Sequence, residues 1–191
     1  YNFNKFSECK GAYRTLCKNN DCKLCFDKSF ANVSMAKYWS IKNIKNPRDM
    51  FKSSGKEFEF NCWCGHSFTV SLHCVTAGIW CPYCSSKELC NISNCKICFD
   101  KSFANHFRSV CLSKQNNISP RAIFKQSDKI YIFDCQCGHS FQSCIKNITY
   151  GKKWCPYCGG KKLCERDNCN ICLDRAFASH KNAIYGSKNN K

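Results

Sequence analysis

Residues 62–84 read CWCGHSFTVSLHCVTAGIWCPYC, and residues 135–158 repeat the pattern as CQCGHSFQSCIKNITYGKKWCPYC. In both stretches a Cys-x-Cys pair precedes a Cys-x-x-Cys pair, which is the ligand spacing of a zinc ribbon. Such short loops aim two sulfurs at one centre, so two pairs complete a tetrahedral site. We therefore predict two four-cysteine zinc sites, at Cys62, Cys64, Cys81 and Cys84 and at Cys135, Cys137, Cys155 and Cys158.

A second block alternates with the first. LCKNNDCKLCFDKSFAN begins at Leu16, LCNISNCKICFDKSFANH at Leu89 and LCERDNCNICLDRAFASH at Leu163, a period of about 73 residues that indicates a tandem array. We expect small zinc-stabilised modules of the zinc-ribbon or treble-clef type, with short antiparallel hairpins, short helices and little conventional core. The predicted divisions are a partial repeat over residues 1–46 and full repeats, each a ribbon plus a knuckle, over residues 47–118 and 119–191.

The second block predicts sites with three cysteines and one histidine, because a His follows the knuckle in two of its copies. These sets are Cys90, Cys95, Cys98 and His106, and Cys164, Cys169, Cys172 and His180. In the first copy Val33 stands at the His position of Cys17, Cys22 and Cys25. Since structural zinc is almost always four-coordinate, we expect Cys9, the nearest spare thiol, to be the fourth ligand.

Two further histidines leave an alternative open. His66 and His139 stand two residues after the second Cys of each ribbon and could replace that Cys as a ligand. Cys74, Cys111 and Cys144 match no set, and we expect them to behave as small buried apolar residues. The four-ligand rule then predicts about five zinc ions per chain.

The 21 cysteines of the 191 residues allow two other interpretations. A disulfide framework is typical of such cysteine density, but the odd total, the knuckle spacings and the repeated His favour metal. WCPYC resembles a glutaredoxin redox motif, but each copy follows a CxCGH hairpin rather than the strand of a βαβ unit. Zinc ligation explains both copies better.

The stretches between the blocks predict the local structure. NPRDMF at Asn46 and SPRAIF at Ser119 each indicate a short helical turn that begins with Pro, followed by a strand. Phe58 and Phe60, or Ile130 and Ile132, are expected to alternate inward along these strands, and residues 66–72 to return as the hairpin partner. After the knuckles, Asp27, Asp100 and Asp174 are expected to cap short helices of two or three turns.

Lys and Arg outnumber Asp and Glu by 30 to 13, a formal net charge of +17. Zinc-bound thiolates lower this to roughly +10, which still favours a polyanionic partner. The basic residues concentrate in the connectors and between the knuckles, at Lys42, Lys45, Arg48, Lys52, Lys56, Lys146, Lys152, Lys153, Lys161 and Lys162. They are either solvated surface or a stripe that contacts phosphates without reading sequence.

The aromatic residues keep fixed distances from the cysteines. Trp80, Trp154, Tyr83 and Tyr157 lie beside or within the second pair of each ribbon. They could stack on bases, but we expect them to form the small core over each zinc. No apolar run is long enough to span a bilayer.

No catalytic pattern emerges from the sequence, which has no phosphate-binding Gly loop and no His-Glu-x-x-His motif. A zinc site with four protein ligands has no position for water or substrate. We therefore predict a non-enzymatic protein without a small-molecule substrate.

FxFxCxCGHSF, then GxWCPYC, then LCxxxxCxxC and SFAxH resemble the zinc-ribbon or treble-clef repeats of giant DNA viruses, over nearly the whole chain from Cys17 to His180. The resemblance implies zinc binding, a large DNA virus as source, and either nucleic-acid contact or a virion or assembly scaffold that binds other viral proteins. It also implies a reducing location, in host cytoplasm or a viral factory, or else the virion. Val33 and the additional Cys64 depart from the pattern. The repeat stops within a connector after His180, so we expect a fragment or a truncated array.

Overall fold

The computed structural model describes Cys9 and residues 15–166 and 168–185. It divides the chain into two compact units, Tyr1–Glu88 and Leu89–Lys191. The predicted repeat boundaries, after residues 46 and 118, stay predictions. In each unit a core joins a knuckle to the ribbon that follows it, and unit 2 also contains the last knuckle.

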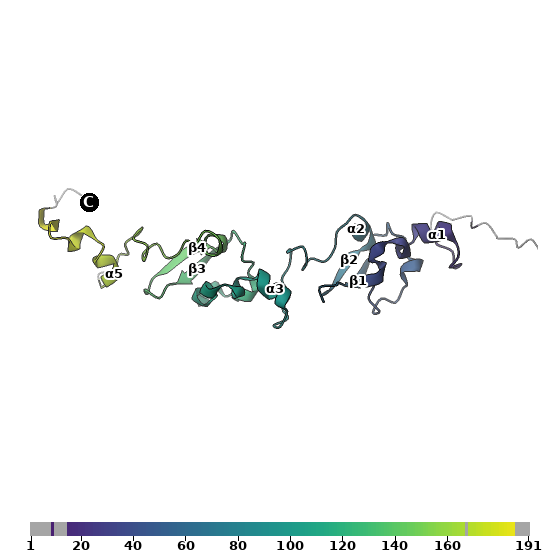
Figure 1. Cartoon of the computed structure of the whole chain (residues 1–191), viewed down its shortest axis with the longest axis horizontal. Helices are drawn as coiled ribbons and strands as arrows, with labels where there is room; N and C mark the ends of the chain where they lie inside the picture. Colours follow the sequence, from purple (N-terminus) through teal and green to yellow (C-terminus); the bar gives the residue numbers. More distant parts are fainter. Residues whose placement is uncertain (1–8, 10–14, 167, 186–191) are drawn as a thin grey trace, which may run out of the picture. The chain divides into compact units, whose positions relative to one another are not determined.

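Unit 2 repeats the series of short elements of unit 1 with one additional 3₁₀ turn, and then adds the last knuckle (Figure 1). Unit 1 contains α1 (Lys23–Lys28), η1 (Phe30–Asn32), η2 (Ser34–Tyr38), η3 (Pro47–Asp49), β1 (Glu57–Asn61), β2 (Ser67–Ser71) and α2 (Leu72–Thr76). Unit 2 contains α3 (Lys96–Lys101), η4 (Phe103–Asn105), η5 (Phe107–Cys111), η6 (Lys114–Asn116), η7 (Pro120–Ala122), β3 (Ile130–Asp134), β4 (Ser140–Cys144), α4 (Ile145–Thr149), α5 (Asn170–Leu173), η8 (Phe177–Ser179) and η9 (Ala183–Tyr185). Among the described residues, no helix is long and apolar enough to cross a membrane.

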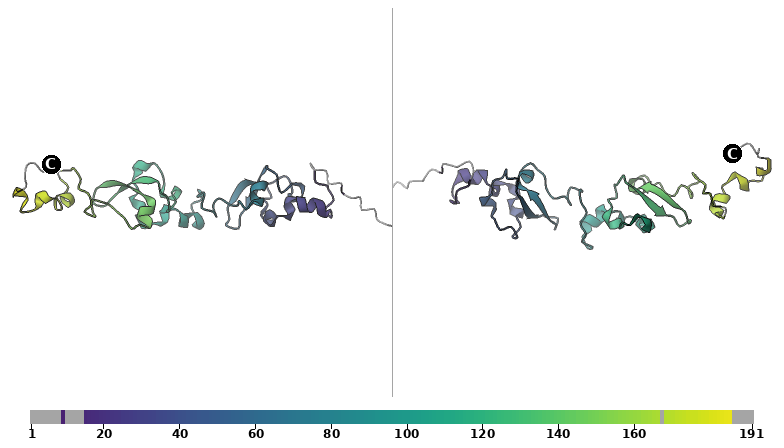
Figure 2. Two further views of the ribbon diagram at one scale, coloured as in Figure 1. Left: turned by 90° about the horizontal axis from the view of Figure 1, so that it is seen from above. Right: turned by 180° about the vertical axis from the view of Figure 1, so that it is seen from behind.

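The predicted hairpin is present in both units, and its two strands lie side by side in each view of Figure 2. β1 pairs antiparallel with β2 and β3 with β4. The Cys-x-Cys lies in the turn, as predicted. Gly65 and Gly138 follow it with φ of 82° and 79°, a left-handed conformation that side chains rarely adopt.

The predicted inward face of the second hairpin is wrong by one residue. Ile130 is 68% exposed, whereas Phe133 is completely buried and pairs with Phe141 across the strands. Phe133 is the counterpart of Phe60, which pairs with Phe68 in the first hairpin. Both Ile130 and Ile132 are apolar, so alternation alone could not fix the phase, and a shift of one residue reverses every side chain.

A small aromatic core joins each knuckle to its hairpin. In unit 1 the ring of Phe30, from η1, lies 5.6 Å from the ring of Phe60, and both are fully buried. The backbone N–H of Phe30 also donates to Met50 at 2.7 Å. In unit 2 Phe103 and Phe133 repeat the pair at 5.9 Å. Because this core holds both blocks, the knuckle and the following ribbon form one unit.

The helices after the knuckles differ from the prediction. α1, α3 and α5 begin directly after Cys22, Cys95 and Cys169, so Asp27 and Asp100 lie inside helices rather than at their N-caps. Each helix has only four to six residues, and 3₁₀ turns follow it. The metal ligands themselves determine where the chain turns, which overrides the preference of Asp for a cap. The predicted turns at Pro47 and Pro120 are present.

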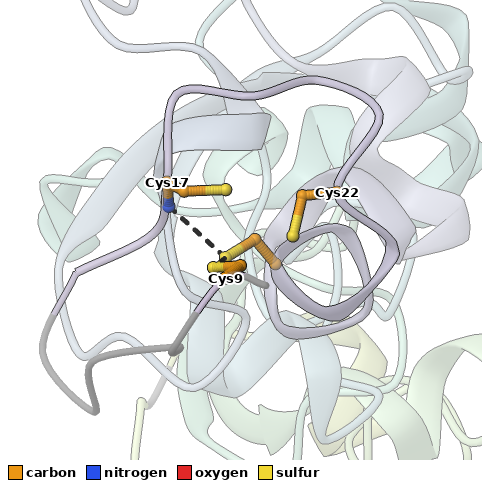
Figure 3. Close-up of side chains that lie close together, drawn as sticks. Cys9, Cys17 and Cys22 are labelled. Atoms are coloured by element: carbon orange, nitrogen blue, oxygen red, sulfur yellow. Dashed lines mark hydrogen bonds between the residues drawn. The ribbon is translucent and has the colours of Figure 1, made fainter. Parts of the chain in front are cut away.

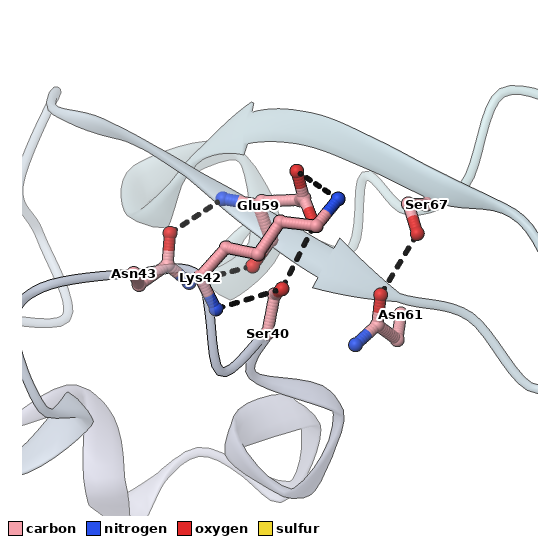
Figure 4. Close-up of polar contacts among 6 residues, drawn as sticks. All are labelled: Ser40, Lys42, Asn43, Glu59, Asn61 and Ser67. Atoms are coloured by element: carbon pink, nitrogen blue, oxygen red, sulfur yellow. Dashed lines mark hydrogen bonds and ion pairs between the residues drawn. The ribbon is translucent and has the colours of Figure 1, made fainter.

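One side-chain amide in each unit completes the outer edge of the hairpin, and Figure 4 shows the amide of unit 1, Asn43. Asn43 donates to the backbone carbonyl of Glu59 at 2.7 Å and accepts from its N–H at 3.0 Å. Asn116 forms the same pair of bonds with Ile132, at 2.7 and 2.9 Å. Both backbone groups of the edge strand are thus satisfied at these positions.

The core geometry predicts unequal effects of two alanine substitutions on the same strand. Phe133→Ala should lower the free energy of unit 2 opening by about 3 kcal/mol or more, because it leaves a cavity among buried rings. Ile130→Ala is the matched control and should change it by less than about 1 kcal/mol, since that side chain is mostly exposed. Hydrogen exchange of residues 130–144 measures both, and equal loss of protection would contradict the observed register.

Candidate metal centres

Five groups of Cys and His side chains come together among the described residues, with ligand atoms within 4.8 Å of one another in each group. Two of them are the predicted ribbon sites. Cys62 and Cys64 from the first hairpin turn meet Cys81 and Cys84, and the second unit repeats the group with Cys135, Cys137, Cys155 and Cys158. The loop of CPYC after the hairpin supplies the second pair in each case.

The sulfur spacings match a zinc tetrahedron. Opposed thiols lie 3.5 and 3.6 Å apart in the first ribbon site, and 3.5 and 3.7 Å apart in the second. Four sulfurs at the zinc–sulfur bond length of about 2.3 Å would be separated by about 3.8 Å. A disulfide requires about 2.05 Å, so these sulfurs lie at ligand spacing and not at bonding distance.

The first knuckle contains the predicted substitute for the missing His. Cys9 joins Cys17, Cys22 and Cys25, and its sulfur lies 3.5 Å from that of Cys25. Figure 3 shows the side chains of Cys9, Cys17 and Cys22 converging on one point. Val33, which stands where His106 and His180 stand in the other copies, lies outside this group. The prediction for Cys9 therefore agrees with the geometry.

The last knuckle corrects the predicted histidine. The fourth member of the group of Cys164, Cys169 and Cys172 is His139, from the turn of the second hairpin, and not His180. The His139 Nε2 atom lies 3.3 Å from the sulfur of Cys169 and 3.5 Å from that of Cys172. With a zinc–nitrogen bond of about 2.0 Å, the expected separation is about 3.5 Å.

His106 and His180 accept hydrogen bonds in the turns that follow the knuckles. Their Nδ1 atoms accept backbone N–H bonds from Arg108 and Asn182, each at 3.2 Å. Their rings lie nearly parallel to those of Phe103 and Phe177. These histidines therefore stabilise the turns after the knuckle, and neither belongs to a metal group of the described residues.

Cys90, Cys95 and Cys98 form the corresponding thiol set at the start of unit 2. In unit 1, His66 occupies the position in the first hairpin that His139 occupies in the second. Its surroundings repeat as well. Its Nδ1 lies 3.1 Å from the sulfur of Cys64, and its ring stacks on Tyr83 at 4.3 Å, while His139 stacks on Tyr157 at the same distance.

The correct histidines could have been found from the sequence. CxCGHSF contains His in both copies, whereas the His after the knuckle is missing from one of three. The described chain has no CxCGHSF block before the first knuckle, and that knuckle uses Cys9 instead. In the first and last knuckles the fourth ligand thus comes from upstream, which makes Val33 an ordinary residue and not an exception.

Two side chains with N–H groups, Arg121 and His139, contact thiols of the knuckles. The Arg121 Nη2 atom lies 3.8 Å from the Cys90 sulfur and bonds two carbonyls of the same loop, of Ile92 and Cys95. In the last knuckle the hydrogen bond with His139 lowers the pKa of Cys164 to about 6 despite the opposing effect of desolvation. Both contacts favour the thiolate form that a metal requires.

The remaining cysteines and the aromatic residues can now be placed. Cys74, Cys111 and Cys144 are half-buried and lie outside the groups of the described residues. Trp80 and Trp154 pack edge-on against Phe68 and Phe141, each at 4.9 Å. The aromatic rings of the ribbon motifs therefore form the core over the metal sites, as predicted.

Comparison with known proteins agrees with this geometry. Residues 111–161, which include the second ribbon, match the family described as Probable Treble clef zinc finger domain. Over 190 residues the chain is 40% identical to an uncharacterized protein of Acanthamoeba polyphaga mimivirus. That alignment covers 96% of this chain and 46% of the viral protein. The predicted resemblance to zinc modules of giant viruses is confirmed, and the five groups are consistent with about five zinc ions.

Zinc analysis of substituted chains separates the two sets of histidines. The unsubstituted chain should hold about five zinc ions, by the four-ligand rule. His139→Ala and Cys9→Ser should each lower the count or the affinity at one site. His106→Ala and His180→Ala, which remove the same ring elsewhere, should leave the metal content unchanged. Loss of zinc from His180→Ala with none from His139→Ala would contradict the assignment.

Metal removal should unfold the chain, whereas reductant should not. Each unit buries few large side chains, so metal binding supplies much of its folding free energy. Circular dichroism in a strong chelator should show loss of the hairpins, and excess reductant should leave the spectrum unchanged. A chain that stays folded in chelator and collapses in reductant would show that sulfur–sulfur bonds hold it together.

Proposed function

We propose that this protein is a non-enzymatic zinc protein that binds nucleic acid through the sugar–phosphate backbone. One observation carries the proposal: a hollow on unit 2 has four lysines in its lining and no carboxylate. The formal charge supports it. With three four-thiolate sites and two sites of three thiolates and one His, zinc would leave a net charge of about +9.

The hollow lies between strand β4 and the second pair of ribbon cysteines. It encloses about 650 Å³. Gln142, Ser143 and Asn147 line one side of it, and the indole of Trp154 lies in the wall. The four exposed lysines complete it, at Lys152, Lys153, Lys161 and Lys162. Amide and hydroxyl groups beside several lysines suit phosphate and sugar contacts that carry no sequence information.

A second basic hollow adjoins the first, because Lys152 and Lys153 line both. Its wall includes Phe107, which is 75% exposed, and Arg108. The Arg108 guanidinium lies 5.0 Å from the Phe107 ring and 3.9 Å from the Trp154 ring. An exposed aromatic ring beside cations is the arrangement on which unpaired bases stack. These contacts favour a single-stranded ligand.

The structure narrows the basic surface predicted from the sequence. Lys42 pairs with Glu59 at 3.2 Å and Lys146 with Asp128 at 3.5 Å. Arg48 is half-buried and donates to the Asn19 carbonyl at 2.9 Å. These three cations are therefore engaged within the protein. In unit 1 Ile79 and Glu88 stand at the positions of Lys153 and Lys162, so two of the four lysines of the hollow have no counterpart there.

The absence of catalysis is part of the proposal. Three of the groups offer four thiolates and the His139 group offers three and an imidazole, so a bound zinc would have no open position. The zinc thiolates require a reducing environment. We therefore place the protein in host cytoplasm, a viral factory or a virion. Closed zinc sites are typical of structural modules.

The alternative is a virion or assembly scaffold that contacts other viral proteins. The exposed apolar side chains of Ile41 and Ile44, at 97% and 103% exposure, favour it. However, these two residues belong to one loop, and their apolar area is smaller than the apolar core of a stable protein interface. The basic hollows combine lysines, polar side chains and an exposed aromatic ring, which the scaffold alternative does not explain. We therefore prefer nucleic acid as the partner.

Binding of a 20-nucleotide single strand and a 20-base-pair duplex, measured by fluorescence anisotropy across salt concentrations, tests the proposal. Changing Lys152, Lys153, Lys161 and Lys162 to Gln should weaken binding at least tenfold and reduce the salt slope by about three, since each lost phosphate contact removes about 0.7 to 0.9. The matched control changes Lys18, Lys23, Lys45 and Lys56 to Gln and removes the same charge from unit 1. Equal weakening by both variants, or no binding by the unsubstituted chain at low salt, would contradict the proposal.

A further inference from the structure

The ring of His139 contacts ligands of two metal groups at once. Its Nε2 faces the sulfurs of Cys169 and Cys172 in the last knuckle. Its Nδ1 lies 3.0 Å from the sulfur of Cys137, which belongs to the ribbon group. We propose that His139 couples these two sites, so that zinc in one strengthens the binding of zinc in the other.

The two ring nitrogens cannot exchange these tasks. A nitrogen that ligates metal carries no proton, so binding through Nε2 places the ring proton of the neutral imidazole on Nδ1. That N–H then donates to the Cys137 sulfur. A hydrogen bond to a zinc-bound thiolate offsets part of its negative charge and fixes its orientation. Zinc in the knuckle thus fixes the Nδ1–H of His139 as a hydrogen-bond donor to the ribbon ligand Cys137.

The coupling also operates in the opposite direction. The ribbon ligands Cys135 and Cys137 shape the hairpin turn, where the Cys135 N–H donates to the His139 carbonyl at 2.8 Å. The ring itself is 97% buried and stacks on Tyr157, which lies between two ribbon ligands in the sequence. Zinc in the ribbon site therefore holds the imidazole where the knuckle needs it. A buried ring that stacks on one neighbour and has contacts at both nitrogens has little freedom to serve one site alone.

A second contact joins the same two elements. The Arg166 guanidinium, in the knuckle loop, donates to the carbonyl of Gly138 at 3.0 Å. Arg166 is also hydrogen-bonded to Cys164, and this bond raises the pKa of the Arg166 guanidinium. The hairpin turn and the knuckle are therefore linked on both sides of His139. In unit 1, Cys64 and His66 repeat the contact between thiol and Nδ1 at 3.1 Å.

Site-resolved thiol alkylation of the zinc-loaded full chain, read by mass spectrometry under a competing chelator, tests the coupling. Cys172→Ser breaks the knuckle site without altering the hairpin. It should speed alkylation of Cys135, Cys137, Cys155 and Cys158 about tenfold, the lower end of the effect of losing an outer partner of a metal ligand. Cys25→Ser, the same change at the equivalent position of the first knuckle, should leave those four rates unchanged.

The His139→Ala background shows whether the ring carries the effect. There, alkylation of the ribbon site should already be fast, and adding Cys172→Ser should change it no further. Cys62, Cys64, Cys81 and Cys84 serve as the reference in every sample and should keep their rates. Unchanged ribbon rates in Cys172→Ser, a further increase in the double variant, or an equal rise at the reference site would each overturn the proposal.

Discussion

The spacing of sulfur atoms within a zinc tetrahedron is the constraint on which every other feature of this chain depends. Sulfurs about 3.5 Å apart repel one another as thiolates unless a cation lies between them. Once a cation is present, four short segments are fixed in position. The two-stranded hairpins and helices of four to six residues, which would be marginal in isolation, then need only a few buried rings to be stable.

The grouping of the zinc ligands could largely be predicted from the sequence, because ligand spacing is a local property of the chain. The structure brings together both predicted ribbon sets, the three cysteines of every knuckle, and Cys9 with the first of them. The hairpins, with cysteines in the turn, were also assigned correctly. In each case the ligands lie within a short stretch of sequence, and their spacing is typical of one kind of site, a zinc site.

Errors arose where the answer depended on contacts between distant segments. His106 follows its knuckle closely in sequence, yet its ring serves a turn, while His139 reaches the last knuckle from the preceding hairpin. The phase of β3 was ambiguous because Ile130 and Phe133 are both apolar, and only the packing against Phe103 decides between them. Tertiary contacts of this kind leave no periodic trace in a single sequence.

The pairing of Asn43 and Asn116 with the hairpin edges bears on how such an array avoids misassembly. Hairpins of the same length and register along one chain, or on neighbouring chains during synthesis, could exchange strands with one another. An amide that occupies both hydrogen-bonding groups of an edge residue denies an incoming strand its attachment point. Duplicated modules can therefore be added to the polypeptide while each hairpin keeps to its own partner.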